Sequence, residues 1–217
     1  MNINLVNESK TYTPANFDAL VQAAKVYIPL VTKAWNLPDY PVTSSAARDP
    51  KAWNVAIVDN FPNPLMSRLA LGYHEVVAGM PIAYASQKAY NRPLGLYYKG
   101  LTLKGRVITK PRYSPGCATV ALHEIAEMLV DPLVKVRKMD AQKRNWVVEI
   151  CDHTKGLFKI DTSVAPVVAP DFTLPAFYEI TTTPGTQLSY LNVPTAPFTL
   201  VPGGYGYQDV AGKMVKL

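Results

Sequence analysis

The sequence predicts an α+β domain built from short strands and two helices. Three observations support this class: an amphipathic segment with helical periodicity near the start of the chain, eight short runs of β-favouring residues, and a high proline content. There are 19 prolines in 217 residues (19/217, about 9%), against a usual ~5%, which disfavours an all-helical bundle. The residues are 48% hydrophobic and 18% charged, a balance typical of a globular domain. No apolar run approaches the roughly 18 residues of a membrane-spanning helix.

The first predicted helix runs from Thr13 to Trp35. Thr13 is a suitable N-cap and Pro14 suits the first helical position. The apolar residues that follow recur at helical spacing and form one stripe: they are Phe17, Leu20, Val21, Ala24, Ile28, Val31 and Trp35.

The second predicted helix begins near Pro115 or Ala118 and ends at Val130. It ends there because Asp131 precedes Pro132, and a residue before proline disfavours the helical conformation. Its N-cap is expected to be Ser114 or Thr119.

Most of the remaining chain predicts short strands. We expect them at residues 53–58, 68–77, 81–85, 101–109, 146–150, 157–160, 177–180 and 198–201, with a closing hairpin at 210–215. Residues 161–204 carry seven prolines and predict an irregular path. We therefore expect one α+β domain over residues 1–160, with a Pro-rich arm over residues 161–217 packed on the same domain.

The charge distribution is uneven. The formal net charge is +6, which supports solubility and mild attraction to polyanions. Between Glu75 and Glu124 the chain has no acidic residue but seven basic ones, interleaved with tyrosines: Lys88, Arg92, Lys99, Lys104, Arg106, Lys110 and Arg112. Such a pattern can suit nucleic acid, yet solvated strand faces with lysine side chains explain it more simply. Nucleic acid therefore ranks last among the expected partners.

The feature that carries chemistry is the HExxE run on the second helix. Residues four apart share a helix face, so His123 and Glu127 can bind one metal ion, as the two histidines of HExxH do. Glu124 lies about 100° further round the helix. It can reach a water beside the ion without binding the ion, which is the position of a general base.

A further ligand must come from elsewhere, because catalytic zinc usually has three protein ligands. Residues 146–153 are the best supplier, with Asp152 as first choice and Glu149 next. Asp131, at the helix end, either binds the ion or holds the following turn. One histidine with carboxylates is harder than a usual zinc set, so calcium and manganese are alternatives to zinc.

The simpler interpretation of HExxE is a solvated helix face with an i,i+4 contact. The neighbouring residues argue against it, because a buried helix keeps polar groups only if these satisfy one another or bind a metal. The apolar neighbours are Val120, Ala121, Leu122, Ile125, Ala126, Met128 and Leu129.

Three other residues allow two interpretations each. His74 is either a half-exposed histidine bonded to its neighbours, or it contacts the metal, its water or the substrate from a strand beside the helix. Cys117 and Cys151 are either buried thiols or a disulfide that joins the two candidate segments.

Several segments between about residues 50 and 206 together resemble a group of uncharacterised tailed-bacteriophage and bacterial proteins. The helix motif and the acidic pair that follows are also similar to the plant phosphate-induced, Exordium-type proteins. The segments are Trp53–Asp59, Ala70–Glu75, His123–Pro132, Glu149–Asp152, Asp171–Phe177 and Pro202–Tyr205.

The resemblance implies a zincin-like arrangement, with His123, Glu124 and Glu127 on the helix and Glu149 and Asp152 in a downstream ExxD. This chain departs from the pattern at two positions. Leu122 replaces a serine, which alters a hydrogen bond around the ligands, and His153 replaces a proline, which adds a candidate ligand.

The leading functional expectation is a zinc-dependent peptidase of zincin type, with a peptide or protein substrate. The alternative is a phage structural or interaction protein whose metal only stabilises the fold, with other phage proteins as partners. No membrane partner is expected. The opening residues lack the basic and apolar regions of a signal peptide, so we expect the host cytoplasm or the virion as the location.

Overall fold

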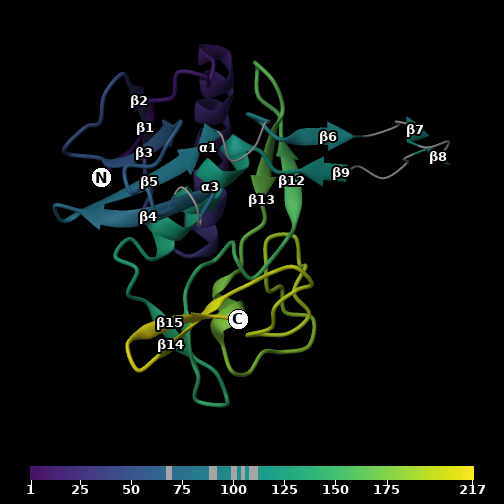
Figure 1. Cartoon of the computed structure of the whole chain (residues 1–217). Coiled ribbons are helices and arrows are strands. Elements are labelled where there is room, and N and C mark those ends of the chain that lie inside the picture. The colour runs from purple at the N-terminus through teal and green to yellow at the C-terminus, as the bar shows by residue number, and fades with distance from the viewer. Residues whose placement is uncertain (67–69, 88–91, 99–101, 104–105, 108–111) are drawn as a thin grey trace.

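A five-stranded mixed sheet with two helices on one face forms the larger part of the fold (Figure 1). The computed structural model describes residues 1–66, 70–87, 92–98, 102–103, 106–107 and 112–217. The protein is α+β, as predicted. Neither helix of the described residues is both long and apolar enough to cross a membrane.

Four of the five strands run parallel to their neighbours, and the fifth is antiparallel and lies at the edge. The edge strand turns back on its partner through Ala78 and Gly79, whose φ angles are 51° and 81°. In spatial order the strands are β2 (Val42–Ser45), β1 (Ile3–Asn7), β3 (Trp53–Val58), β5 (Met80–Ser86) and β4 (Gly72–Val77).

The first helix confirms the prediction from the sequence. Helix α1 spans Pro14–Ala34, and the Thr13 side chain accepts a hydrogen bond of 3.3 Å from the Asn16 amide. One face of α1 is buried, because the apolar stripe packs against the sheet and the second helix.

The second helix, α3, spans Cys117–Val130 and has Asp131 as its C-cap, as predicted. The expected N-cap is wrong, since that position is Gly116. A Cβ atom there would lie 2.2 Å from the Gly95 amide nitrogen, so only glycine fits. Thr119 still contributes, because its hydroxyl oxygen accepts a hydrogen bond of 2.9 Å from the Gly116 amide.

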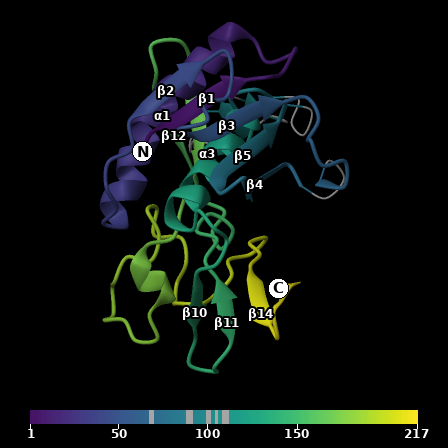
Figure 2. The same cartoon turned by 90° about the vertical axis from the view of Figure 1, so that its left-hand side faces the viewer.

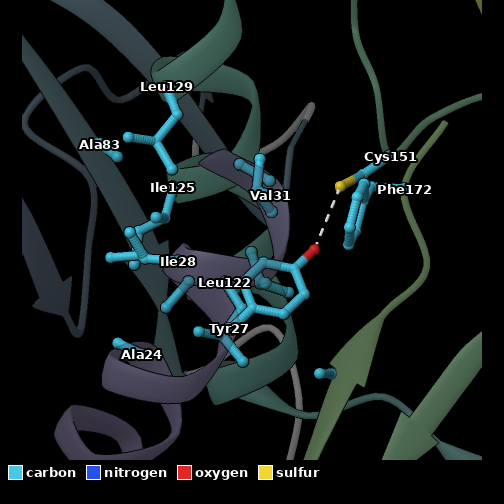
Figure 3. Close-up of a cluster of buried hydrophobic side chains, with 14 of the residues drawn as sticks. Ala24, Tyr27, Ile28, Val31, Ala83, Leu122, Ile125, Leu129, Cys151 and Phe172 are labelled. Atoms are coloured by element: carbon cyan, nitrogen blue, oxygen red, sulfur yellow. Dashed lines mark hydrogen bonds between the residues drawn. The ribbon is translucent and has the colours of Figure 1, made fainter. Parts of the chain in front are cut away.

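The core lies between the two helices and the sheet (Figure 3). Ile28 and Val31 of α1 lie close to Leu122 and Ile125 of α3. One cluster of buried apolar side chains extends from Ile3 to Phe198, so the Pro-rich C-terminal residues share this core.

The C-terminal half adds an antiparallel sheet below the helices (Figure 2). Its strands, in spatial order, are β10 (Arg137–Met139), β11 (Asn145–Val147), β14 (Tyr207–Val210) and β15 (Lys213–Lys216). Three two-stranded pairs complete the described strands: β12 (Leu157–Ile160) with β13 (Val167–Pro170), β6 (Leu96–Tyr98) with β9 (Arg112–Ser114), and β7 (Thr102–Leu103) with β8 (Arg106–Val107).

The strand predictions are confirmed at 53–58, 81–85, 157–160 and the closing hairpin. Two are wrong. Residues Pro175–Tyr178 form a 3₁₀ helix, η2, because Pro175 suits a first helical turn. Residues 198–201 form no strand, and Phe198 has a φ of 52°, which is incompatible with an extended chain.

Three further predicted strands have different bounds. In the run 68–77 the strand starts only at Gly72, and residues 67–69 lie outside the described part. The run 146–150 ends at Val147. The run 101–109 yields the short strands β7 and β8, and its other residues lie outside the described part. So do Lys88, Lys99, Lys104 and Lys110 of the basic run.

Candidate metal centre

The candidate site is built on the face of α3 that carries the HExxE residues. The His123 Nε2 atom lies 3.1 Å from Glu127 Oε2, as expected for residues one helical turn apart. Glu124 and Glu127 are buried, whereas the His123 side chain is 23% exposed. The helix therefore holds two buried carboxylates next to a histidine that solvent can reach.

The segment after β11 brings a further carboxylate to the same histidine. Asp152 Oδ1 lies 3.1 Å from His123 Nε2. The segment is fixed on both sides: the Cys151 amide donates to Glu127 Oε1 at 3.2 Å, and the Tyr205 amide donates to the Asp152 carbonyl at 3.1 Å. The structure thus brings together His123, Glu127 and Asp152.

In the described part of the chain, three polar atoms of this site have no hydrogen-bond partner. Asp152 Oδ1 is buried and has no hydrogen-bond partner, although it lies close to His123. Glu149 Oε2 and His74 Nε2 are also buried without a partner. Unsatisfied buried polar atoms of this kind are unfavourable, and a cation among them would supply the missing interaction.

Within the described residues, two groups have ligand atoms close enough to hold a metal ion. One comprises His123, Glu127 and Cys151, and the other His74, Glu127 and Glu149; within each, the ligand atoms lie within 4.8 Å of one another. The cleft therefore contains buried side chains that can hold a metal ion, and Glu127 belongs to both groups.

His74 extends from β4 toward the helix. Its Nδ1 atom lies 3.4 Å from Glu124 Oε2, and its side chain is only 4% exposed. Its side chain is therefore buried rather than half-exposed, and a contact with the metal, its water or the substrate stays a prediction. The close approach depends on Gly72, where a Cβ atom would lie 2.4 Å from Val120 Cγ1 and 2.8 Å from Glu124 Oε1.

Burial and neighbouring charges shift the pKa values of the site residues. The pKa of Glu149 is raised well above its usual value by burial and then by the charges of Glu127, Asp152 and Glu124. Burial also raises the pKa of Glu127, against the opposing effect of His123. The pKa of His123 is raised well above its usual value, since Glu127, Cys151 and Asp152 outweigh the opposing effect of burial.

A cleft of about 550 Å³ opens over these groups. The face of α3 and the edge strand β4 form one side of it, and residues around Asp152 and the last hairpin form the other. Tyr205 lies beside Asp152, with Lys216 Nζ 4.0 Å from the ring centroid. The volume of the cleft is within the range of clefts that bind small ligands.

Other candidate residues have structural roles. The Asp131 carboxylate accepts hydrogen bonds of 2.8 Å from the Lys135 and Val136 amides, so it holds the turn after α3. His153 is fully buried among aromatic rings, and burial lowers its pKa to about 4. The added histidine thus packs in the core.

The two cysteines are free and buried, so the alternative of a disulfide is wrong. Cys151 Sγ lies 3.8 Å from the Tyr27 hydroxyl (Figure 3). Burial raises the pKa of both thiols, which keeps them protonated.

Sequence reasoning missed three features of the site: Cys151 as a member of a ligand group, Tyr205 beside Asp152, and Gly72 against the helix. A glycine within a strand pattern is a signal of close backbone approach, and Gly72 could have been found in this way. No local pattern marks the other two.

Comparison with known proteins gives no relative for this chain: no protein-family model, no curated protein and no solved structure matches it.

Proposed function

We propose that this protein is a metal-dependent hydrolase of zincin type that cleaves peptide bonds, with zinc as the ion and manganese or calcium as alternatives. The observation that carries the proposal is that Glu127 Oε2 and Asp152 Oδ1 both lie 3.1 Å from His123 Nε2, next to a further buried carboxylate, Glu124. Three ligands that leave one position open are typical of catalytic zinc.

In this proposal the bound ion, Glu124 and His74 have separate roles. A bound divalent ion would polarise the scissile carbonyl and make a neighbouring water more acidic. Glu124 takes the proton from that water and passes it to the leaving amine. His74 holds Glu124 through the 3.4 Å contact between its Nδ1 and Glu124 Oε2. The other carboxylate oxygen, Oε1, lies near the cleft wall at Gly72.

The edge strand supports a peptide as substrate. Among the described strands β4 pairs with β5 alone, and it borders the cleft at Gly72, Tyr73 and His74. An extended peptide can add to such an edge through main-chain hydrogen bonds. This arrangement of a helix beside a mixed sheet with an antiparallel edge strand favours the zincin-like interpretation.

The bound ion would also join α3 to the segment after β11, which favours the alternative of an ion that only stabilises the fold. Two observations favour catalysis instead: His123 is 23% exposed, and the ligands line an open cleft. A purely structural site is usually closed.

The test starts with metal analysis of the purified chain and a broad peptide-hydrolysis screen with zinc, manganese and calcium. With a substrate found, Glu124→Gln should keep the ion and the fold and lower turnover by roughly 10²-fold or more, because it removes the base.

Glu75→Gln is the matched control, since Glu75 lies next to His74 on β4 but does not line the cleft. It should leave turnover unchanged. Equal cleavage by wild type and Glu124→Gln would rule out the mechanism. If no peptide is cleaved and His123→Ala strips the ion and lowers the Tm, the stabilising role is the better account.

A further inference from the structure

We propose that the cleft holds a second divalent cation, bound by His74, Glu127 and Glu149, with Glu127 shared between this ion and the one at His123 and Asp152. The proposal rests on the first metal centre of the proposed function and adds a site to it.

The geometry of the second ligand set supports the proposal. The ligand atoms of His74, Glu127 and Glu149 lie within 4.8 Å of one another. Ligands at 2.0–2.6 Å from one ion are separated by roughly 3–4.5 Å, so a small inward movement completes the set. The three side chains come from β4, from α3 and from the segment after β11, which hold the site from three directions.

The second set also contains unsatisfied atoms of its own. Within the described residues, His74 Nε2 and Glu149 Oε2 have no hydrogen-bond partner. Both groups are buried, since the His74 side chain is 4% exposed and Glu149 is 8% exposed. The Glu124 contact occupies Nδ1 of His74 and leaves Nε2 for the ion. A metal-binding histidine usually has such a carboxylate on its other nitrogen.

Charge balance favours two ions over one. Four carboxylates are buried together: Glu124, Glu127, Glu149 and Asp152. In the part of the chain that the structure describes, only histidines form ion pairs with them, and no lysine or arginine does. Histidines that bind a metal are neutral, so one divalent ion would leave two negative charges uncompensated, whereas two ions balance all four.

A shared carboxylate fits the spacing of known two-metal sites, in which the ions lie about 3.5–4 Å apart and act on opposite ends of the reacting group. Glu127 is close to both sites, because its Oε2 lies 3.1 Å from His123 Nε2 and its ligand atom lies within 4.8 Å of those of His74 and Glu149. The set of one histidine and two carboxylates suits manganese and zinc.

The test is the number of ions bound by the full chain. The protein is stripped with a chelator, dialysed against excess Mn²⁺ or Zn²⁺, and analysed for metal per chain. Wild type should bind two ions. Glu149→Gln and His74→Ala should each bind one, and His123→Ala should also bind one, because each removes a ligand of a single site. Glu75→Gln is the control and should bind two.

Electron paramagnetic resonance of the Mn²⁺-loaded chain gives a second readout. Two ions that share Glu127 should show the exchange-coupled spectrum of a close pair, and Glu149→Gln should show the spectrum of an isolated ion. Circular dichroism checks that each variant is folded, and Glu149→Gln, which conserves size, replaces His74→Ala if the latter does not fold.

The outcomes separate this proposal from the proposed function. One ion per wild-type chain, with turnover intact, overturns the second site and leaves the hydrolase. One ion that is lost in both His123→Ala and Glu149→Gln means that all the ligands hold a single ion, which also overturns it. No ion in the wild type overturns both proposals.

Discussion

Buried carboxylates occur in two regions of this protein, and the groups that surround them differ between the two regions. In the turns, each carboxylate accepts hydrogen bonds. Asp140 accepts from the Gln142 amide at 2.9 Å and from Trp146 Nε1 at 2.8 Å. Asp171 accepts from the Thr154 hydroxyl at 2.6 Å and from the Leu191 amide at 2.8 Å. Such aspartates fix the path of irregular chain.

In the cleft, the carboxylates face one another. Glu149 Oε2 and Asp152 Oδ1 have no hydrogen-bond partner among the residues that the structure describes. The pKa values differ accordingly: that of Glu149 is raised by burial and by its acidic neighbours, whereas that of Asp140 is lowered because hydrogen bonds from Trp146 and Arg144 outweigh burial. A buried carboxylate whose oxygens accept hydrogen bonds has a structural role. A buried carboxylate that lies beside other carboxylates is a candidate for binding a cation.

The largest expected effect on folding concerns a structural carboxylate. Asp140→Ala removes the acceptor of the buried Trp146 indole N–H and should lower the free energy of unfolding by about 3 kcal/mol. Metal content should not change. Chemical denaturation measures the first quantity and elemental analysis the second. Asp39→Ala, at an exposed aspartate, is the control. An unchanged free energy of unfolding in Asp140→Ala would contradict the conclusion that the carboxylates in the turns stabilise the fold.

A smaller effect is expected where the strand meets the helix. In Gly72→Ala the new Cβ would lie 2.4 Å from Val120 Cγ1 and 2.9 Å from the Tyr84 carbonyl oxygen. The overpacking should lower the free energy of unfolding by about 2 kcal/mol. Turnover should also fall, because β4 moves away from Glu124. Full activity in a folded Gly72→Ala would show that this approach does not matter for the site.

Substitution of a cleft carboxylate should stabilise the metal-free protein, in contrast to Asp140→Ala. In the metal-free protein, Glu149→Gln removes a carboxyl group whose charged form is disfavoured by burial and by its acidic neighbours. The free energy of unfolding should therefore rise by roughly 0.5 kcal/mol, the size of a like-charge contact. In the presence of Mn²⁺ the variant should lose this advantage, because it binds fewer ions. Thermal unfolding with and without metal makes the comparison. If Glu149→Gln instead destabilises the metal-free protein, Glu149 has a structural role like that of Asp140.

The smallest expected effect is a pH dependence of the metal-free protein. The pKa values of Glu149 and His123 are raised in the folded state, so the folded protein binds more protons than the unfolded chain. Their stabilising effect is therefore complete below the unfolded pKa values and is lost as the pH rises through the folded ones. His153 has a pKa lowered to about 4. It makes the folded state more stable as the pH rises, but only below about pH 6.5.

Above pH 6.5 the metal-free protein should thus become less stable as the pH rises. Metal binding should become tighter over the same range, because the ligands lose their protons more easily. Thermal unfolding from pH 6.5 upward, with and without Mn²⁺, gives both curves. Parallel curves would mean that the cleft residues do not titrate with folding.

The two helices could be predicted from the sequence because their signals are local. Thr13 and Pro14 start the first helix, and the Asp131–Pro132 pair ends the second. The irregular C-terminal half was less predictable. Its η2 helix lies in a run of β-favouring residues, and there tertiary packing outweighs propensity.

The sequence by itself determined the α+β class, both helices, and the face of α3 that carries His123 and Glu127, because helical periodicity fixes which residues lie together. Only the tertiary structure decided that Asp152 meets His123, that His74 lies buried against Glu124, and that His153 packs among aromatic rings. These contacts join residues 24 to 50 positions apart, and no local pattern encodes them. They arise because β4 and the segment after β11 both approach the face of α3 that carries the HExxE residues.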